Sequence, residues 1–255
     1  MGSDSVLLER QDNVAVISFN RPERLNAWSP DINDGFLEKL DMAAKDDTIR
    51  GVVLTGVGRA FCAGADLKNP NTHSVSNPEE YLDSHRGQPV FDALESFGKP
   101  IMSAVNGFSV GIGCLVPLCC DFIFVNEHAK FCLPQTRLGI LPAYGGTLRL
   151  ARWVGRGNAL NIALTGRHVG AEEALRIGIA TELVPADELV QRSVETMQAI
   201  AKMPVHAVRL TRESLALGYD AGMKSTQQAD NFRFMALAQT QDRADAHESW
   251  RMTRS

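Results

Sequence analysis

The sequence lacks an excess of positive charge. Its 26 Lys and Arg residues are outnumbered by 30 Asp and Glu residues, which gives a formal net charge of −4 at pH 7. Without a broad positive field, neither nucleic acid nor an anionic membrane surface is an expected partner. Any anionic ligand must therefore be held by local basic groups.

Long apolar runs are also missing. No stretch approaches the roughly 18 apolar residues that a membrane-spanning helix needs. Residues 1–10 lack the basic segment followed by an apolar stretch that marks a secretory signal. We therefore expect a cytoplasmic protein with no membrane partner.

Cysteine is present without a paired motif. The five cysteines are odd in number, stand inside apolar stretches and show no C-x-x-C spacing. This pattern predicts neither a zinc site nor a disulfide framework, so we expect no metal and buried, unreactive thiols. The five are Cys62, Cys114, Cys119, Cys120 and Cys132.

The chain does contain enough apolar material for one large core, since 44% of its 255 residues are hydrophobic. A single domain of this length is common among α/β proteins. No linker, low-complexity segment or fixed-period repeat divides it. We expect residues 1–200 to form the ligand-binding core and residues 201–255 a helical C-terminal region of the same domain.

Strands and helices alternate in the first half of the sequence. A helix is predicted to begin at Ser29, because a hydroxyl at the N-cap precedes Pro30 and Asp31, and to run to about Lys45. Further helical stretches are expected over residues 79–97 and after Gly113. Strands are predicted from short apolar or β-branched runs at Val14–Phe19, residues 51–55, Ile101–Val105 and Phe122–Val125.

After Gly139 we expect strands to give way to helices. Over residues 187–203, for example, apolar side chains recur at helical spacing on one face. The alternating first half predicts an α/β fold with right-handed crossovers between parallel strands. The helical end is of a kind that often packs on neighbouring subunits.

Two Gly-rich turns are the candidate ligand-binding segments. Residues 59–67 (RAFCAGADL) follow a predicted strand and carry small side chains, so a ligand can approach the backbone closely. Residues 106–113 (NGFSVGIG) follow another strand and lead into a helix, whose first N–H groups are unpaired at the positive end of the dipole. Either segment suits a developing negative charge.

A second interpretation of the latter turn is a hydrolase. Its G-x-S-x-G pattern places Ser109 where the nucleophile of a serine hydrolase stands, between a strand and a helix. Asp121 and His206 follow in the chain, but any protein of this size offers such residues. No His-Gly-Gly-Gly oxyanion motif precedes the serine.

Several motifs together resemble the crotonase, or enoyl-CoA hydratase/isomerase, superfamily. They occur in the order and spacing of that family and extend over nearly the whole chain. The resemblance implies a spiral of β-β-α units with a helical C-terminal region used in trimerisation, and acyl-CoA binding by the core. The motifs are NRPERLNA at 20–27, AFCAGADL at 60–67, KP at 99–100, AVNG at 104–107, CD at 120–121, GGT at 145–147, RL at 149–150, LTG at 164–166 and AEEA at 171–174.

The resemblance implies an oxyanion hole made by the backbone N–H groups of Ala65 and Ile112. Two fixed donors stabilise an enolate-like oxygen far better than a ground-state carbonyl. A side chain at position 112 keeps the donor but replaces glycine with a β-branched residue, which is expected to narrow the pocket.

The resemblance also implies which residues contact coenzyme A, a part of the substrate and not a separate, tightly bound cofactor. Lys68 and Arg24 are the expected phosphate partners, with solvated surface charge as the alternative. The other residues expected to contact coenzyme A, mostly through their backbone groups, are Ala63, Asp66 and Leu67.

At three positions the sequence departs from the family. Hydratases of this superfamily use two glutamates, and the matching positions hold Leu115 and Gln135. Some isomerases and dehydratases carry an acid just before Gly-Gly-Thr, where this chain has Ala143. A positioned acid or base supplies roughly 10²–10⁴ in rate. Ordinary two-glutamate hydration is therefore not expected.

Other groups are candidates for proton transfer. Tyr144 offers a phenol O–H in the same turn, Gln135 can orient water or a carbonyl without a usable pKa, and His85 stands on the helix predicted over residues 79–97. Simple packing of Tyr144 and a surface place for His85 are the alternatives. That predicted helix also carries Tyr81, Asp83 and Arg86.

Two functional hypotheses remain. In the first, the protein is a lyase or isomerase with divergent acyl-CoA chemistry driven by oxyanion stabilisation. In the second, it is an acyl-CoA binding protein that has kept the fold and lost the chemistry. By the same resemblance, we expect a homotrimer or homohexamer.

Overall fold

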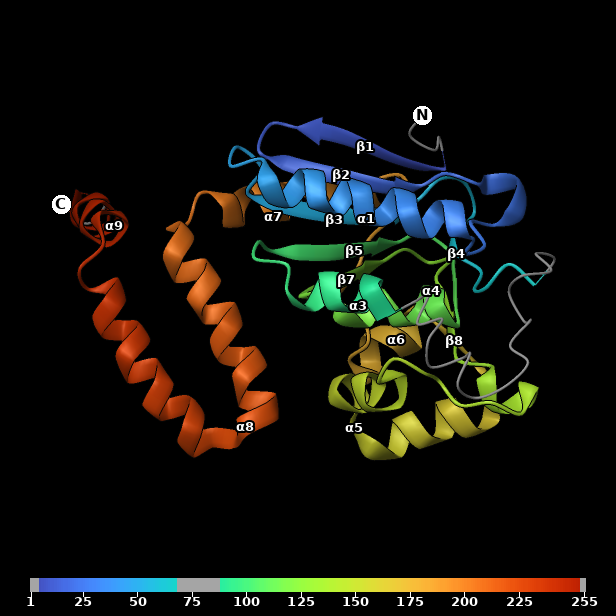
Figure 1. The fold of residues 1–255 in the computed structure, drawn as a ribbon. Helices are drawn as coiled ribbons and strands as arrows, with labels where there is room; N and C mark the ends of the chain where they lie inside the picture. The colour runs from blue at the N-terminus through green and yellow to red at the C-terminus, as the bar shows by residue number, and fades with distance from the viewer. Residues whose placement is uncertain (1–4, 68–87, 253–255) are drawn as a thin grey trace.

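Two β-sheets contain the strands of this protein in the computed structural model, which describes residues 5–67 and 88–252 (Figure 1). The larger sheet has the order β1-β2-β3-β5-β7-β10 and the smaller β4-β6-β8-β9. Strands of the larger sheet are β1 (Val6–Gln11), β2 (Val14–Phe19), β3 (Gly51–Gly56), β5 (Ile101–Val105), β7 (Phe122–Val125) and β10 (Glu182–Leu183). Strands of the smaller sheet are β4 (Ala60–Cys62), β6 (Phe108–Val110), β8 (Lys130–Cys132) and β9 (His168–Gly170).

The chain alternates between the two sheets. β3, β5 and β7 lie in the larger sheet, and the strands that directly follow them, β4, β6 and β8, lie in the smaller one. Helices complete the turns of this spiral: α3 (Gln88–Glu95) follows β4, α4 (Ile112–Leu115) follows β6 and α5 (Gly146–Thr165) follows β8. The β-β-α spiral expected from the resemblance is the observed architecture.

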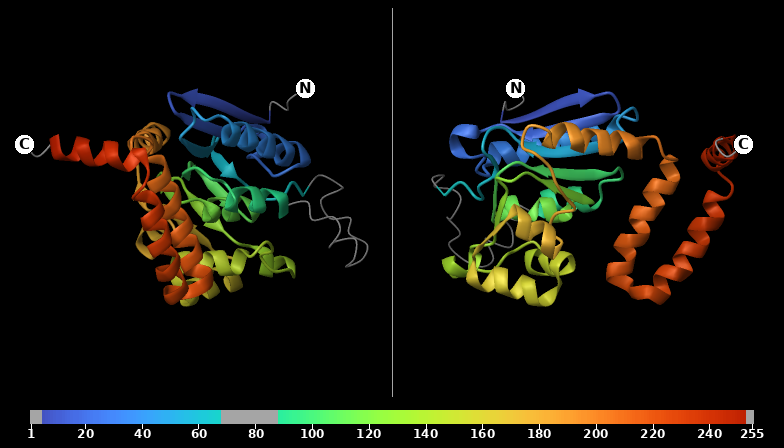
Figure 2. Two further views of the ribbon diagram at one scale, coloured as in Figure 1. Left: turned by 60° about the vertical axis from the view of Figure 1, so that its left-hand side comes forward. Right: turned by 180° about the vertical axis from the view of Figure 1, so that it is seen from behind.

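Helices cover both faces of the larger sheet (Figures 1 and 2). Val52 and Leu54 of β3 belong to one buried cluster with side chains of α1 (Pro30–Lys45), whereas Val53 belongs to a second with α7 (Leu189–Ala201). This alternation explains why β3 is buried at every residue.

Most predicted elements agree closely with the structure. α1 begins after Ser29, whose side chain accepts a hydrogen bond from the N–H of Ile32, and β2, β5 and β7 match their predicted runs. α7 lies within the predicted helix of residues 187–203 and packs on the chain's own sheet. Of the helix predicted over residues 79–97, the structure describes α3, and residues 79–87 lie outside the described part.

Other expectations were wrong. Strands continue beyond Gly139, because β9 and β10 follow it. β9 has three residues and β10 has two, so neither is long enough to show a periodic pattern in the sequence. β4 and β6 lie inside the two segments predicted as turns, because their short runs pair with each other in parallel. α6 (Ala171–Ile177) separates β9 from β10, and the 3-10 helices are η1 (Pro22–Arg24), η3 (Pro117–Cys119) and η4 (Gln135–Leu138).

The C-terminal helices extend away from the sheets as an arm (Figure 1). α8 (Val205–Leu237) bends at Gly222, which has a φ of 75°, and α9 (Gln241–Met252) follows it. Neither helix contains a buried residue. In the described part of the chain, no helix has the length and apolarity to cross a membrane.

Candidate functional site

The loop after β4, residues 63–66, presents the first predicted donor, the backbone N–H of Ala65. The N–H of Trp28 donates to the carbonyl oxygen of Gly64 at 2.7 Å, and the N–H of Asp66 donates to that of Trp28 at 2.9 Å. These bonds form a parallel bridge between Trp28 and Ala65, in which the N–H of Ala65 points to the opposite side. This N–H has no backbone acceptor within residues 5–67 and 88–252, and Ala65 is exposed.

The turn from β6 into α4 presents the second predicted donor, the backbone N–H of Ile112. Gly111, with a φ of 57° and a ψ of −121°, is the N-cap of α4 and has a backbone conformation that glycine adopts most easily. Its carbonyl oxygen accepts hydrogen bonds from the N–H groups of Cys114 and Leu115. Ile112 is the first helical residue, so its N–H is one of the unpaired donors of the helix start. Its side chain is half-buried against the core.

These two segments touch through their glycines. A Cβ atom on Gly113 would lie 2.3 Å from the carbonyl oxygen of Cys62, and one on Gly64 would lie 3.0 Å from that of Val110. A Cβ atom on Gly111 would lie 3.9 Å from the Cα of Gly64. Backbone therefore packs directly on backbone, and the loops that carry Ala65 and Ile112 adjoin each other.

Gln135, the first residue of η4, borders the same place. A Cβ atom on Gly111 would lie 3.7 Å from its Nε2. The Oε1 atom of Gln135 is buried and has no hydrogen-bond partner among the residues that the structure describes. Leaving such an acceptor unpaired costs about 1–3 kcal/mol. A ligand or water that donates to Oε1 removes this penalty.

Apolar contacts occupy the positions where related enzymes carry acids. Leu115 is 1% exposed, and its Cδ2 lies 2.7 Å from where a Cβ atom on Gly146 would stand. Pro142 packs against Gly146 from another side. Ala143 is half-buried, and its carbonyl oxygen accepts a hydrogen bond from the N–H of Gly146 at 2.9 Å. None of these side chains can transfer a proton.

Tyr144 lies in an aromatic stack. Its ring is 4.9 Å from that of Phe91 on α3, with an interplanar angle of 17°. The guanidinium of Arg149 lies over the ring of Phe91, 5.5 Å from its centroid. The Nε of Arg149 donates to the carbonyl oxygen of Tyr144. Arg149 also pairs with Glu95 at 2.6 Å. The sequence assigned no site role to Phe91 or Arg149, although Arg149 stands in one of the family motifs.

The predicted coenzyme A contacts lie around Asp66, which is 7% exposed. Arg24 reaches its carboxylate at 3.8 Å, and Arg21 at 3.3 Å. Arg21 was not predicted as a site residue, although it stands in the same motif as Arg24. Ala63 is half-buried, with its N–H bonded to the carbonyl oxygen of Leu25, and Leu67 is exposed. Lys68 and His85 lie outside the described residues.

The structure argues against the hydrolase interpretation. Ser109 is the middle residue of β6, fully buried, and its hydroxyl donates to the carbonyl oxygen of Gly113 at 2.9 Å. A nucleophile elbow would instead place the serine on an exposed turn. Asp121 is paired with Arg212 at 2.8 Å, and His206 is exposed on α8.

The five cysteines are free thiols. Burial raises the pKa of Cys62, Cys114 and Cys119 to about 12, and it also raises the pKa of Cys120 and Cys132. A thiol, unlike a thiolate, is a poor nucleophile and metal ligand. No group of three or more His, Cys, Asp and Glu side chains could hold a metal ion in the part of the chain that the structure describes.

Comparison with known proteins agrees with this architecture. Residues 9–254 match the model of the enoyl-CoA hydratase/isomerase family. A short-chain-enoyl-CoA hydratase of Clostridium acetobutylicum is 33% identical over 251 residues, covering 96% of this chain and 94% of that protein. A 2,3-dehydroadipyl-CoA hydratase of Escherichia coli is 32% identical over 238 residues, covering 93% and 92%.

Solved structures show the same fold. The crystal structure of an enoyl-CoA hydratase subunit I from Geobacillus kaustophilus superposes with a TM-score of 0.93 at 28% identity, covering 100% of this chain and 98% of the other. Its similarity spans both sheets, the two adjoining loops and the C-terminal arm. This chain therefore belongs to the enoyl-CoA hydratase/isomerase family, within the crotonase superfamily.

Proposed function

We propose that this protein binds an acyl-CoA thioester whose carbonyl oxygen accepts hydrogen bonds from the backbone N–H groups of Ala65 and Ile112. One observation carries this function: two adjoining loops each hold a backbone N–H without a backbone acceptor among the described residues. The relatives named as enoyl-CoA hydratases support a coenzyme A thioester as the ligand class.

Coenzyme A enters this site as part of the substrate, with no other cofactor. Arg24 and Lys68 are the proposed phosphate partners, and Ala63, Asp66 and Leu67 contact the nucleotide mostly through backbone groups. The side chain of Arg24 is 38% exposed and 3.8 Å from Asp66. At that exposure and distance, the ion pair is weak and leaves the guanidinium available to a phosphate.

The proposed chemistry passes through an enolate-like oxygen. Each oxyanion donor typically contributes about 10²–10³ in rate. Leu115 and Ala143 offer no proton, so hydration by two glutamates is not proposed. The reactions that remain as candidates are isomerisation, hydration or elimination with another acid or base, and cleavage of a thioester or C–C bond. Tyr144, His85 and Gln135 are the candidates to move or orient the proton or water.

A second candidate function is acyl-CoA binding without turnover. The packing of Leu115 against Gly146 favours it, because an apolar side chain fills the place of a proton-transfer group. Under this function, the two N–H groups donate hydrogen bonds to the thioester carbonyl, and the bound acyl-CoA undergoes no reaction.

A panel experiment separates the two functions. The purified protein is incubated with linear, branched and aromatic enoyl- and acyl-CoA thioesters, with products followed by mass spectrometry and binding by calorimetry. A new product from any thioester establishes the enzyme. Binding without turnover across the panel establishes the binding protein, and absence of binding to every thioester contradicts both.

We also propose that the protein is a homotrimer or homohexamer and works in the cytoplasm. The arm of α8 and α9 exposes large apolar side chains that a second copy of this chain would cover. They include Tyr219, Met223, Phe232, Phe234 and Met235. Five free thiols suit a reducing compartment.

A further inference from the structure

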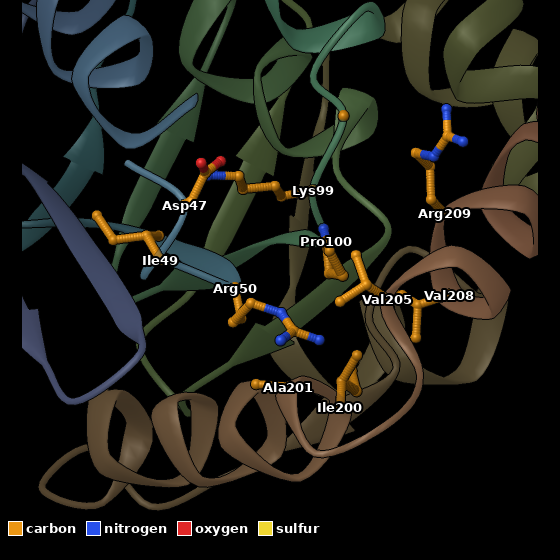
Figure 3. A pocket seen from close by; sticks show the side chains of 11 residues that line it. Asp47, Ile49, Arg50, Lys99, Pro100, Ile200, Ala201, Val205, Val208 and Arg209 are labelled. Atoms are coloured by element: carbon orange, nitrogen blue, oxygen red, sulfur yellow. The ribbon is translucent and has the colours of Figure 1, made fainter. Parts of the chain in front are cut away.

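A cavity of about 270 Å³ lies where α7 passes into α8, beside the N-terminal ends of β3 and β5 (Figure 3). Arg50 and Pro100, which line it, directly precede those two strands. The loops of Ala65 and Ile112 follow the opposite, C-terminal ends of the β3–β4 and β5–β6 segments. The cavity is therefore separate from the proposed thioester site.

The floor of the cavity is apolar. Ile49 and Pro100 come from the core, Ile200 from the last turn of α7, and Val205 and Val208 from the first turn of α8. Apolar side chains from four segments thus line a space, open on one side, whose volume is just below the roughly 300 Å³ at which small-molecule sites usually begin. Its size suits a ligand of a few carbon atoms.

Two of the cations at the cavity already have partners. The Nζ of Lys99 donates to the carbonyl oxygens of Ala43 and Asp46 at 2.8 and 2.7 Å, and in Figure 3 it points toward the carboxylate of Asp47. Arg209 pairs with Glu213 at 3.3 Å. These two charges are compensated by the protein itself.

Arg50 differs from both. Arg50 is half-buried as a residue, and its guanidinium extends over the apolar floor toward Ile200 and Val205 (Figure 3). Its Nη2 donates to the carbonyl oxygen of Met203 at 3.3 Å, and no carboxylate lies within ion-pair distance among residues 5–67 and 88–252. The guanidinium is exposed at this bond and offers a fork of donors that matches a carboxylate.

We infer that this cavity binds a small organic monocarboxylate, with its carboxylate on the guanidinium of Arg50 and its short alkyl chain on the floor formed by Ile49, Pro100, Ile200, Val205 and Val208. The charge of Arg50 and the apolar floor together select a ligand that has both a carboxylate and an alkyl chain. A carboxylate without an alkyl chain leaves the floor in water, and a neutral alkyl compound leaves Arg50 without an anion. The inference is independent of the thioester site.

Hexanoate is the probe for the full-length protein. Calorimetric titration with hexanoate is expected to show one site per chain, with acetate, inorganic phosphate and the neutral hexanamide each binding about tenfold or more weakly. Arg50→Gln is expected to weaken hexanoate binding by a similar factor. Arg156→Gln, which removes one exposed arginine from α5, is the matched control and leaves binding unchanged.

A second variant tests the floor without changing the charge. Val208→Phe fills the cavity and is expected to weaken hexanoate binding, while circular dichroism and the Tm without ligand report whether each variant folds. Phosphate binding as tightly as hexanoate would overturn the selectivity. Hexanoate binding that survives both Arg50→Gln and Val208→Phe would place the ligand elsewhere, including the thioester site, and overturn the inference.

Discussion

Arg21 and Asp66, 45 residues apart in the chain, form an ion pair at 3.3 Å that closes over the first donor loop. Their side chains are 21% and 9% exposed. Arg21 also donates from Nη1 to the carbonyl oxygen of Ala27 at 3.1 Å. Because Asp66 directly follows Ala65, the pair holds the residue beside the proposed oxyanion donor to the segment that precedes α1.

Replacing Arg21 by methionine is expected to loosen this loop. Asp66 would lose this contact and keep the longer one with Arg24, and we expect a loss of about 1–3 kcal/mol in the free energy of unfolding. A bound acyl-CoA with a ¹³C-labelled thioester should show a carbonyl stretch shifted back toward its value in water, measured by infrared spectroscopy. Arg192→Met, which breaks the surface pair with Glu182 at 2.8 Å, is the control. An unchanged carbonyl stretch in Arg21→Met would show that the pair does not position Ala65.

Ile112→Pro removes one proposed donor with little disturbance of the backbone. Proline is tolerated at the first position of a helix, where the N–H is unpaired anyway. We expect the polarisation of the thioester carbonyl to fall, and any turnover found in the thioester panel to fall by about 10²–10³. Ile112→Ala keeps the N–H, truncates the side chain and should retain the polarisation. Equal effects of the two substitutions would assign the role to the side chain and not to the N–H.

Installing two carboxylates tests what the site lacks. We expect Leu115→Glu combined with Gln135→Glu to gain slow hydration of crotonyl-CoA, measured by loss of the enoyl absorbance. The same change should lower the stability by about 1–3 kcal/mol, because position 115 is 1% exposed and faces Gly146. Leu115→Gln combined with Gln135→Glu has similar shape and one acid fewer, and should stay inactive. A double variant that folds and binds crotonyl-CoA without hydrating it would contradict this prediction.

The buried thiols predict a loss of stability at alkaline pH. Burial raises the pKa of Cys62, Cys114 and Cys119 from 9.0 to about 12 in the folded protein. Unfolded thiols therefore release protons first, so stability is complete below pH 9 and declines as the pH rises toward 12. At pH 11, one such thiol accounts for up to about 3 kcal/mol.

Denaturant unfolding in reducing buffer at pH 8 to 11 measures this decline. Cys119→Ala should lower the slope of the unfolding free energy against pH, whereas Ser96→Ala on the same side of the molecule should not. Parallel curves for Cys119→Ala and the unchanged protein would show that this thiol does not contribute.

The exposed arm predicts self-association. Light scattering after gel filtration should give three or six times the 27.8 kDa chain mass. Phe232 is 74% exposed on α8, and Phe232→Glu is expected to shift the protein toward smaller species. Gln228→Glu adds the same charge on the same helix and should leave the assembly intact. A monomer at micromolar concentration would contradict the proposed trimer or hexamer.

The sequence by itself determined the elements whose signals are local. Ser29 and Pro30 cap and start α1 through bonds within one turn, so its bounds are readable without the rest of the fold. β2, β5 and β7 are apolar runs long enough to be recognised. The motifs that carry the family resemblance likewise pointed to two loops that the structure brings together.

Tertiary structure decided what depends on distant partners. β9 and β10 exist only because they pair with β8 and β7, since two or three residues carry no periodic pattern. The contact between Arg21 and Asp66 and the burial of the Gln135 Oε1 arise in the same way, from segments that meet only in the folded chain. A side chain's partners and burial are properties of the packing around it, and residue type and spacing alone do not contain them.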